Sequence, residues 1–210
     1  TLLTCNNYAS LLMSLDRHDE AEALLVDSIA RVDASPNKRG GNLATMLDNL
    51  AMLYEDIGRP EDAEPCYRRA LGIFEEIYGP DHPDTVIAKH NFGGYLRTQG
   101  RAEDALPLLE AAAGAAPATF GESSWLTAHF RGGHGACLGL LGRYEEAEAL
   151  LLQSEAGVRA ALGDTDRRTR TACDRLARLY GSWNGREEAA AAWRAKVAEI
   201  DGAPSPTGGK

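Results

Sequence analysis

The sequence predicts an all-α fold, a right-handed α-solenoid of five antiparallel helix hairpins, on the basis of three observations. The first is a 42-residue period, at which Ala21, Ala63, Ala105, Ala147 and Ala189 recur. The second is the helical spacing of apolar residues around these alanines, and the third is that no long segment alternates as a strand does. A fixed period of roughly 20–50 residues is typical of stacked repeats, each of which buries its apolar face against its neighbours.

The second repeat illustrates how one hairpin forms. Apolar residues in 43–57 follow i, i+3, i+4 spacing, which predicts a helix. Gly58 predicts the end of that helix, because glycine adopts the left-handed conformation without steric penalty. Pro60 predicts the start of the second helix, where a missing N–H costs nothing. We expect Gly79 to end the second helix and Pro83 to begin the next one.

The same template predicts two helices in every repeat. The first helices are expected near 2–15, 43–57, 84–99, 126–141 and 168–182, and the second helices near 18–33, 60–78, 102–115, 144–162 and 186–200. We therefore expect one repeat domain over 1–200, with repeats at about 1–42, 43–84, 85–126, 127–168 and 169–200. The Pro-, Gly- and Ser-rich tail at 201–210 is predicted to be disordered.

The composition excludes several classes of function. A net charge of -9 argues against general nucleic-acid binding, which needs a basic face. No run of about 18 apolar residues predicts a transmembrane helix, and the N-terminal residues do not form a signal peptide. Cys5, Cys66, Cys137 and Cys173 form no CxxC pair, so they are interpreted as reduced, mostly buried thiols, with disulfides or metal ligands as the alternative. We expect a cytoplasmic protein that contacts neither nucleic acid nor membrane.

No catalytic motif is recognisable in the chain. The histidines are scattered and HExxH is missing, so neither an enzyme nor a metal site is predicted. The glycines between 132 and 142 lack the strand and the Lys-Ser/Thr of a phosphate loop, and we expect no cofactor. Because each glycine inside a helix costs about 0.5–1 kcal/mol, the helix at 126–141 is predicted to be the least stable and a candidate hinge.

Several short motifs together resemble tetratricopeptide repeats: Asn49-Leu50-Ala51, Gly58-Arg59, Ala63-Glu64 and Gly79-Pro80-Asp81-His82-Pro83. The period and the Gly-x-Asp-His-Pro linker resemble the kinesin light chain type. The resemblance covers about 1–200 and is weakest in the fourth repeat. It implies a non-catalytic scaffold that binds a peptide or helix of a partner protein in a concave groove lined by the first helices.

The resemblance also implies which residues line this groove. Asparagines just before the Leu-Ala pair contact the peptide backbone in the family, and Asn7, Asn49 and Asn91 stand in that column. Helical spacing adds Asp48, Met52, His90, Arg97, Arg175 and Arg178. The alternative is that the asparagines only order the stack of hairpins. Likewise, the acidic second repeat and the basic start of the fifth either orient a charged peptide or are solvated faces.

A second resemblance concerns the end of the chain. Leu176–Trp183 with Ala189–Arg194 resembles the last repeat of bacterial serine/threonine protein kinases that carry such repeats behind the kinase domain. The chain lacks an initiator methionine and all kinase motifs, so we expect a fragment of a longer bacterial signalling protein. The alternative function is therefore an intramolecular sensor or docking arm that contacts an upstream kinase or nucleotide-switched ATPase domain.

Overall fold

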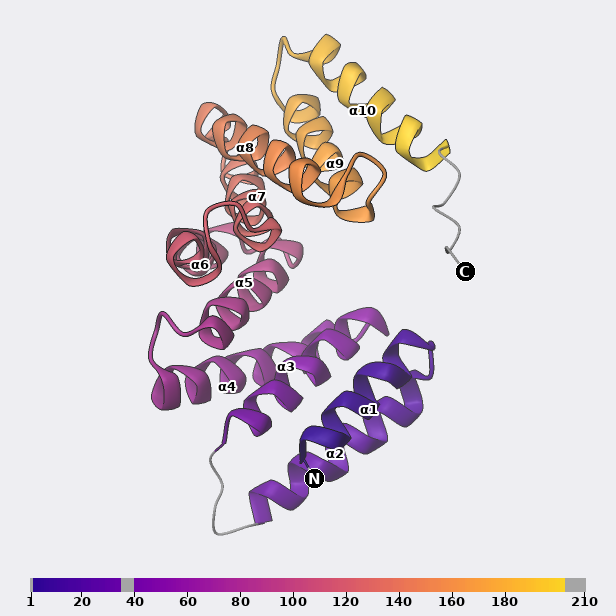
Figure 1. Ribbon diagram of the computed structural model, residues 1–210, viewed down its shortest axis with the longest axis vertical. Helices are drawn as coiled ribbons and strands as arrows, with labels where there is room; N and C mark the ends of the chain where they lie inside the picture. Colours follow the sequence, from indigo (N-terminus) through magenta and orange to yellow (C-terminus); the bar gives the residue numbers. More distant parts are fainter. Residues whose placement is uncertain (1, 35–39, 203–210) are drawn as a thin grey trace. The chain divides into compact units, whose positions relative to one another are not determined.

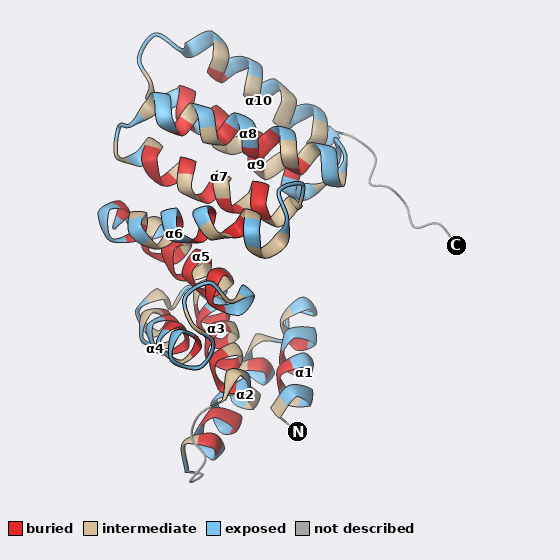
Figure 2. Ribbon diagram, turned by 60° about the vertical axis from the view of Figure 1, so that its left-hand side comes forward, coloured by how far each residue is buried: buried red, intermediate tan, exposed pale blue. Residues whose placement is uncertain are grey.

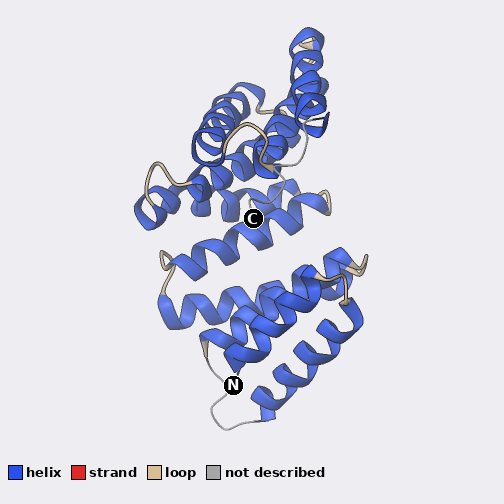
Figure 3. Ribbon diagram, turned by 45° about the vertical axis from the view of Figure 1, so that its right-hand side comes forward, coloured by secondary structure: helices blue, strands red, loops and turns tan. Residues whose placement is uncertain are grey.

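The computed structural model describes residues 2–34 and 40–202, and within these ranges the chain forms ten helices and no strand (Figures 1 and 3). The helices are α1 Leu2–Ser14, α2 His18–Ala34, α3 Gly41–Asp56, α4 Pro60–Tyr78, α5 Pro83–Thr98, α6 Ala102–Phe120, α7 Trp125–Leu140, α8 Tyr144–Leu162, α9 Arg167–Ser182 and α10 Glu187–Gly202. The predicted all-α repeat solenoid is confirmed.

Helix α6 is the clearest departure from the predicted boundaries, since it continues five residues past the expected end at 115. Pro117 lies inside the helix, where proline removes one backbone donor. The helix ends instead at Gly121, whose φ of 92° is in the left-handed region. Gly121 follows Gly79 by one 42-residue period, so the end of the helix follows the repeat.

The chain divides into two compact bodies, an N-terminal unit of residues 1–95 and a C-terminal unit of residues 96–210. In the N-terminal unit α3 packs against α4 and α1, and in the C-terminal unit α7 packs against α6, α8 and α9. Helix α10 reaches Gly202, so the first two residues of the predicted tail are helical. Residues 203–210 lie outside the described part of the chain, and the expected single domain stays a prediction.

The turns inside the hairpins use left-handed backbone at equivalent positions. Gly58, Gly100 and Gly142 each have φ of 75°, and they are separated by one repeat. In the first repeat the same place holds Asp16, with φ of 57°, the one non-glycine residue of the described chain with positive φ. In the fifth repeat the left-handed residue is Gly185, one position later than the period predicts.

This one-residue slip corrects the predicted alanine column. Ala21, Ala63, Ala105 and Ala147 are fully buried as expected, whereas Ala189 is half-buried and its neighbour Ala190 is 1% exposed. The backbone N–H of Ala190 donates to the carbonyl of Arg186 over 3.0 Å, as that of Ala147 donates to Arg143. Because the turn after α9 is one residue longer, Ala190 rather than Ala189 occupies the buried position of the alanine column.

Small residues at the helix crossings allow close packing. A Cβ placed on Gly135 of α7 would lie 3.0 Å from Cγ of Leu151 and 3.2 Å from the carbonyl oxygen of Ala147, both on α8. Such distances are tighter than ordinary van der Waals contact, so a larger residue would separate the two helices. The buried residues form inward stripes along the helices (Figure 2).

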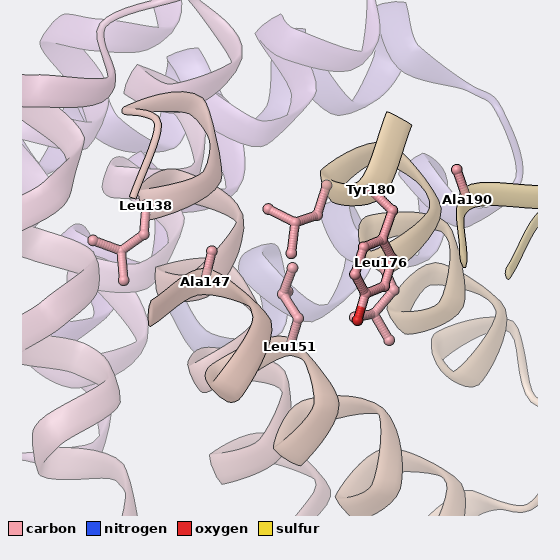
Figure 4. Close-up of a cluster of buried hydrophobic side chains, with 7 residues drawn as sticks. Leu138, Ala147, Leu151, Leu176, Tyr180 and Ala190 are labelled. Atoms are coloured by element: carbon pink, nitrogen blue, oxygen red, sulfur yellow. The ribbon is translucent and has the colours of Figure 1, made fainter. Parts of the chain in front are cut away.

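The C-terminal unit has a core of leucines, alanines and one tyrosine (Figure 4): Leu138, Ala147, Leu151, Leu176, Leu179, Tyr180 and Ala190. Trp183 and Trp193 are partly buried against this core. The ring of Trp183 stacks on Tyr144, with 5.3 Å between ring centroids, and Lys196 lies 3.8 Å from the ring centroid of Trp193. The two tryptophans therefore cover the end of the core.

The four cysteines are free thiols, with Cys137 and Cys173 buried and the other two half-buried. In the described part of the chain, no helix is both long and apolar enough to span a bilayer. Nor does any group of three or more His, Cys, Asp or Glu residues in that part come together as a metal site.

Candidate binding face of the first helices

Polar side chains connect the first helices of the N-terminal unit. Asn49 Nδ2 on α3 donates to Asn6 Oδ1 on α1 over 2.7 Å and to Ser10 Oγ over 3.3 Å. Asn91 Nδ2 on α5 donates to Asp48 Oδ2 on α3 over 2.8 Å. The donors of the Asn6–Asn49 and Asp48–Asn91 pairs each lie 43 residues after their acceptors. We call Asn6, Ser10, Asp48, Asn49 and Asn91 the polar ladder.

Asp48 is the charged member of the polar ladder and is buried. Its Oδ1 has no hydrogen-bond partner in the described part of the chain. Burial raises the pKa of the Asp48 carboxyl to about 6, the hydrogen bond from Asn91 acts against this, and the charge of Glu55 adds to it. Oδ1 is therefore a buried acceptor whose hydrogen bond is not formed, which adds to the cost of the charged carboxylate.

Glu55, two turns after Asp48, is held from the second helix of its own hairpin. Tyr67 Oη on α4 donates to Glu55 Oε1 over 2.6 Å, and burial raises the pKa of the Tyr67 hydroxyl. The Tyr67 ring stacks on Phe92, with 6.0 Å between centroids, and lies against Tyr95. Spacing alone places Tyr67 in an apolar stripe, and it carries no signal for the bond of its polar tip.

The structure joins three of the predicted groove residues of the N-terminal unit in the polar ladder. Asp48, Asn49 and Asn91 belong to the polar ladder, but Asn6 rather than Asn7 pairs with Asn49. Asn7 is exposed on α1, and Met52 is 41% exposed on α3. His90 is buried on α5. Asn49 and Asn91 thus hydrogen-bond between first helices, and their contact with a ligand stays a prediction.

The other predicted residues, Arg97, Arg175 and Arg178, lie together in the C-terminal unit. They line a cavity of about 300 Å³ formed by α7, α8, α9 and the end of α5. Asp174 is the acidic residue of the lining. Leu140, Leu151 and Leu179 are among its apolar residues. We call this space the arginine cavity.

Arg175 lies across the surface of α7. Its Nη1 donates to the backbone carbonyl of His129 over 3.3 Å. Burial lowers the pKa of Arg175 to about 10, with a further contribution from the charge of Arg97, so the side chain stays charged at neutral pH. A Cβ on Gly132 would collide with this guanidinium and with Oγ of Ser154. Gly132 therefore leaves the space that Arg175 occupies.

Gly135 and Gly139 of α7 are also in close contact with neighbouring helices. A Cβ on Gly139 would lie 2.9 Å from Cδ1 of Leu179, and Gly135 is tightly packed against α8. These contacts oppose the loss of stability that the intrinsic propensity of glycine predicts for this helix. The sequence-based expectation of a hinge considered that propensity alone.

Arg178 is the exposed arginine of the cavity. Its Nε donates to Asp174 Oδ2 over 2.7 Å, which engages the acidic residue of the lining. The hydroxyls of Thr171 and Ser182 donate to backbone carbonyls of their own helix, over 2.9 Å in each case. Three of the polar side chains that line the cavity are guanidinium groups, whose charge favours an anion.

The comparisons with known proteins agree with this architecture. The tetratricopeptide repeat family matches residues 1–76 and 42–118, more than half of the chain. No curated protein matches the sequence. Three solved structures share the fold at low sequence identity. Nearly identical kinesin light chain repeats from Podosopora anserina are 20% identical with a TM-score of 0.75, covering 95% of this chain and 94% of that chain.

BtubC (BKLC) from P. vanneervenii is 20% identical with a TM-score of 0.74, covering 96% of this chain and 82% of that chain. YrrB, a tetratricopeptide repeat protein with an unusual peptide-binding site, is 20% identical with a TM-score of 0.57, covering 95% of this chain and 86% of that chain. The family match, the repeat period and the left-handed turns at that period lead to one conclusion. The chain belongs to the tetratricopeptide repeat family.

Proposed function

We propose that the chain is a non-catalytic scaffold that binds a peptide or short helix of a partner protein along its first helices. The observation that carries this proposal is the polar ladder, which holds amide and carboxylate groups of α1, α3 and α5 in fixed positions. Side chains held before binding lose less conformational entropy when a ligand arrives. The description of YrrB as a peptide-binding repeat protein supports the same class of function.

The ladder favours a ligand that donates hydrogen bonds. Asn49 and Asn91 bond to the first helix of the preceding repeat through Nδ2, which leaves Oδ1 of each amide as an acceptor. Asp48 adds a buried negative charge beside them. Backbone N–H groups of an extended peptide, or a basic side chain beside Asp48, match these acceptors. The exposed side chains of Asn7 and Met52 would contact the same ligand.

Two variants that break the same hydrogen bond test this proposal. Asn49→Ala removes the bond to α1 together with the asparagine amide, whereas Asn6→Ala removes the bond and keeps that amide. Affinity capture with mass spectrometry identifies partners of the unsubstituted chain, and calorimetry with a peptide from a captured partner measures affinity. We expect about tenfold weaker binding to Asn49→Ala and a smaller loss for Asn6→Ala, which keeps the Asn49 amide but no longer holds it in place. Equal affinity for all three chains, with equal circular dichroism, would make the asparagines purely structural.

Docking onto another domain of a larger cytoplasmic signalling enzyme is the second candidate, and the apolar face of α1 favours it. Tyr8 and Leu11 are 49% and 52% exposed, whereas Leu50 and Leu53, one repeat later, are 4% and 0% exposed. An exposed apolar face of this kind is typical of an interaction surface. A kinase or ATPase domain encoded by the same gene should slow amide exchange in α1. Unchanged exchange would refute docking at this face.

A further inference from the structure

The arginine cavity has the composition of a site for a small anion and plays no part in the polar ladder. Its lining includes Arg97, Arg175 and Arg178 against the single acidic residue Asp174. The formal charge of the lining is therefore positive by two. Such an excess on a partly enclosed surface of an otherwise acidic chain concentrates anions there.

Arg175 is the arginine of the cavity whose charge is most clearly desolvated. In the described part of the chain it forms no ion pair, and its hydrogen bond is to the carbonyl of His129. The like charge of Arg97 adds to the cost of burying this guanidinium, as the lowered pKa of Arg175 reflects. The charge of Asp174 offsets part of this cost, but Asp174 is held by Arg178, and an anion between Arg97 and Arg175 would offset it further.

The size and walls of the cavity define the rest of the ligand. About 300 Å³ is more space than a bare phosphate or carboxylate fills. Leu140, Leu151 and Leu179 offer apolar contact beside the guanidinium groups. The ligand should therefore carry an organic group as well as a charged head.

We propose that the arginine cavity binds a phosphate monoester, with its phosphoryl oxygens on Arg97 and Arg175 and its organic group against Leu140 and Leu179. A phosphate monoester carries about -1.5 to -2 charges at pH 7, close to the excess of the lining, whereas a single carboxylate carries half as much. The planar fork of arginine also matches two phosphoryl oxygens at once. This inference goes beyond the peptide function, since the site recognises the phosphate group whether it is free or attached to a protein.

Calorimetry with phenyl phosphate, inorganic phosphate and acetate tests the site on the unsubstituted chain. We expect phenyl phosphate to bind more tightly than inorganic phosphate, and acetate to bind at least about tenfold more weakly than phenyl phosphate. Arg175→Gln should weaken phenyl phosphate by at least about tenfold. Arg167→Gln removes the same charge from the same helix outside the cavity, and should leave the affinity unchanged.

Arg97→Gln supplies a second variant should Arg175→Gln disturb folding, which circular dichroism would reveal. Failure of phenyl phosphate to bind, or equal affinity for the unsubstituted, Arg175→Gln and Arg97→Gln chains, would overturn the proposal, as would acetate binding as tightly as phenyl phosphate. A phosphotyrosine peptide that binds more tightly than phenyl phosphate would assign the site to a protein ligand. Weaker binding of the phosphotyrosine peptide than of phenyl phosphate would assign the site to a small phosphate ester. Asn49→Ala leaves the cavity intact, so the two proposals fail independently.

Discussion

Asn91 of α5 donates a hydrogen bond from Nδ2 to Oδ2 of Asp48 on α3 over 2.8 Å, and the same bond joins Asn49 to Asn6 one repeat earlier. Asn6 and Asp48 occupy equivalent positions, so the donor is kept while the acceptor changes from an amide oxygen to a carboxylate. The change introduces a buried charge, which is why the pKa of Asp48 rises to about 6.

Replacement of Asp48 by asparagine should stabilise the chain at neutral pH. Because the folded-state pKa of Asp48 lies above its ordinary value of 3.8, the folded chain holds this proton more tightly than the unfolded chain. That contribution to stability is present below about pH 4 and is lost as the pH rises through about 6. Asp48→Asn removes this loss and recreates the Asn6–Asn49 pair. We expect the free energy of unfolding to rise by about 1–3 kcal/mol at pH 7 and little at pH 4.

Urea unfolding of both chains at the two pH values measures this difference. Asp19→Asn, an equal change on the second helix α2, provides the control for general charge effects. A gain for Asp48→Asn of the same size at pH 4 and pH 7 would contradict the assignment to a buried carboxylate.

Alanine should have opposite effects at two glycines of the C-terminal unit. In Gly132→Ala the new Cβ meets the guanidinium of Arg175 and Oγ of Ser154, and we expect a loss of about 1–3 kcal/mol. In Gly114→Ala of α6 the new Cβ meets open space, so the better helix propensity should stabilise the chain by about 0.5–1 kcal/mol. Chemical denaturation measures the free energy of unfolding of both variants. If both changes stabilise the chain, Arg175 moves aside at little cost.

The slip in the fifth repeat predicts different costs at two adjacent alanines. Ala190 is buried in the core, whereas Ala189 is half-buried beside it. Ala190→Leu should cost about 1–3 kcal/mol through overpacking, and Ala189→Leu should cost less than about 1 kcal/mol. Thermal unfolding of the two variants provides the comparison. A larger loss of stability for Ala189→Leu than for Ala190→Leu would mean that Ala189 is the buried alanine, as the 42-residue period alone predicts.

Glycine at position 16 should stabilise the first hairpin. Asp16 has φ of 57°, a conformation that a residue with a Cβ adopts at a cost, and its side chain is 96% exposed. Asp16→Gly should therefore raise the free energy of unfolding by about 0.5–1 kcal/mol. The reverse change at the equivalent turn, Gly58→Asp, should lower it by a similar amount. If both changes destabilise the chain, Asp16 has a role that the backbone conformation does not explain.

The sequence predicts the helices well because their ends have local causes. Gly58 and Gly79 end helices through backbone freedom, and Pro60 and Pro83 begin them, so pattern and spacing suffice. The shift from Ala189 to Ala190 was not predictable in this way, since it depends on how the turn after α9 passes over the core.

The pairing of the polar side chains in the candidate site could not be predicted from the sequence. Spacing places Asn49 on a face of its helix, yet only the stacking of α3 on α1 selects Asn6 rather than Asn7 as its partner. Likewise, Arg175 and Gly132 lie on different helices, and their contact follows from packing between repeats. Interactions across an offset of 43 residues have no local signal.

The 43-residue offset of the polar ladder bears on how the length of such an array can change. Removal of residues 43–84, one whole repeat, would bring Asn91 into the place of Asn49, facing Asn6. Insertion of a second copy of residues 43–84 would place the copied Asn49 opposite Asp48, and Asn91 opposite the copied Asp48. Gain or loss of a complete hairpin by duplication or deletion in the gene would therefore keep the connections between helices intact.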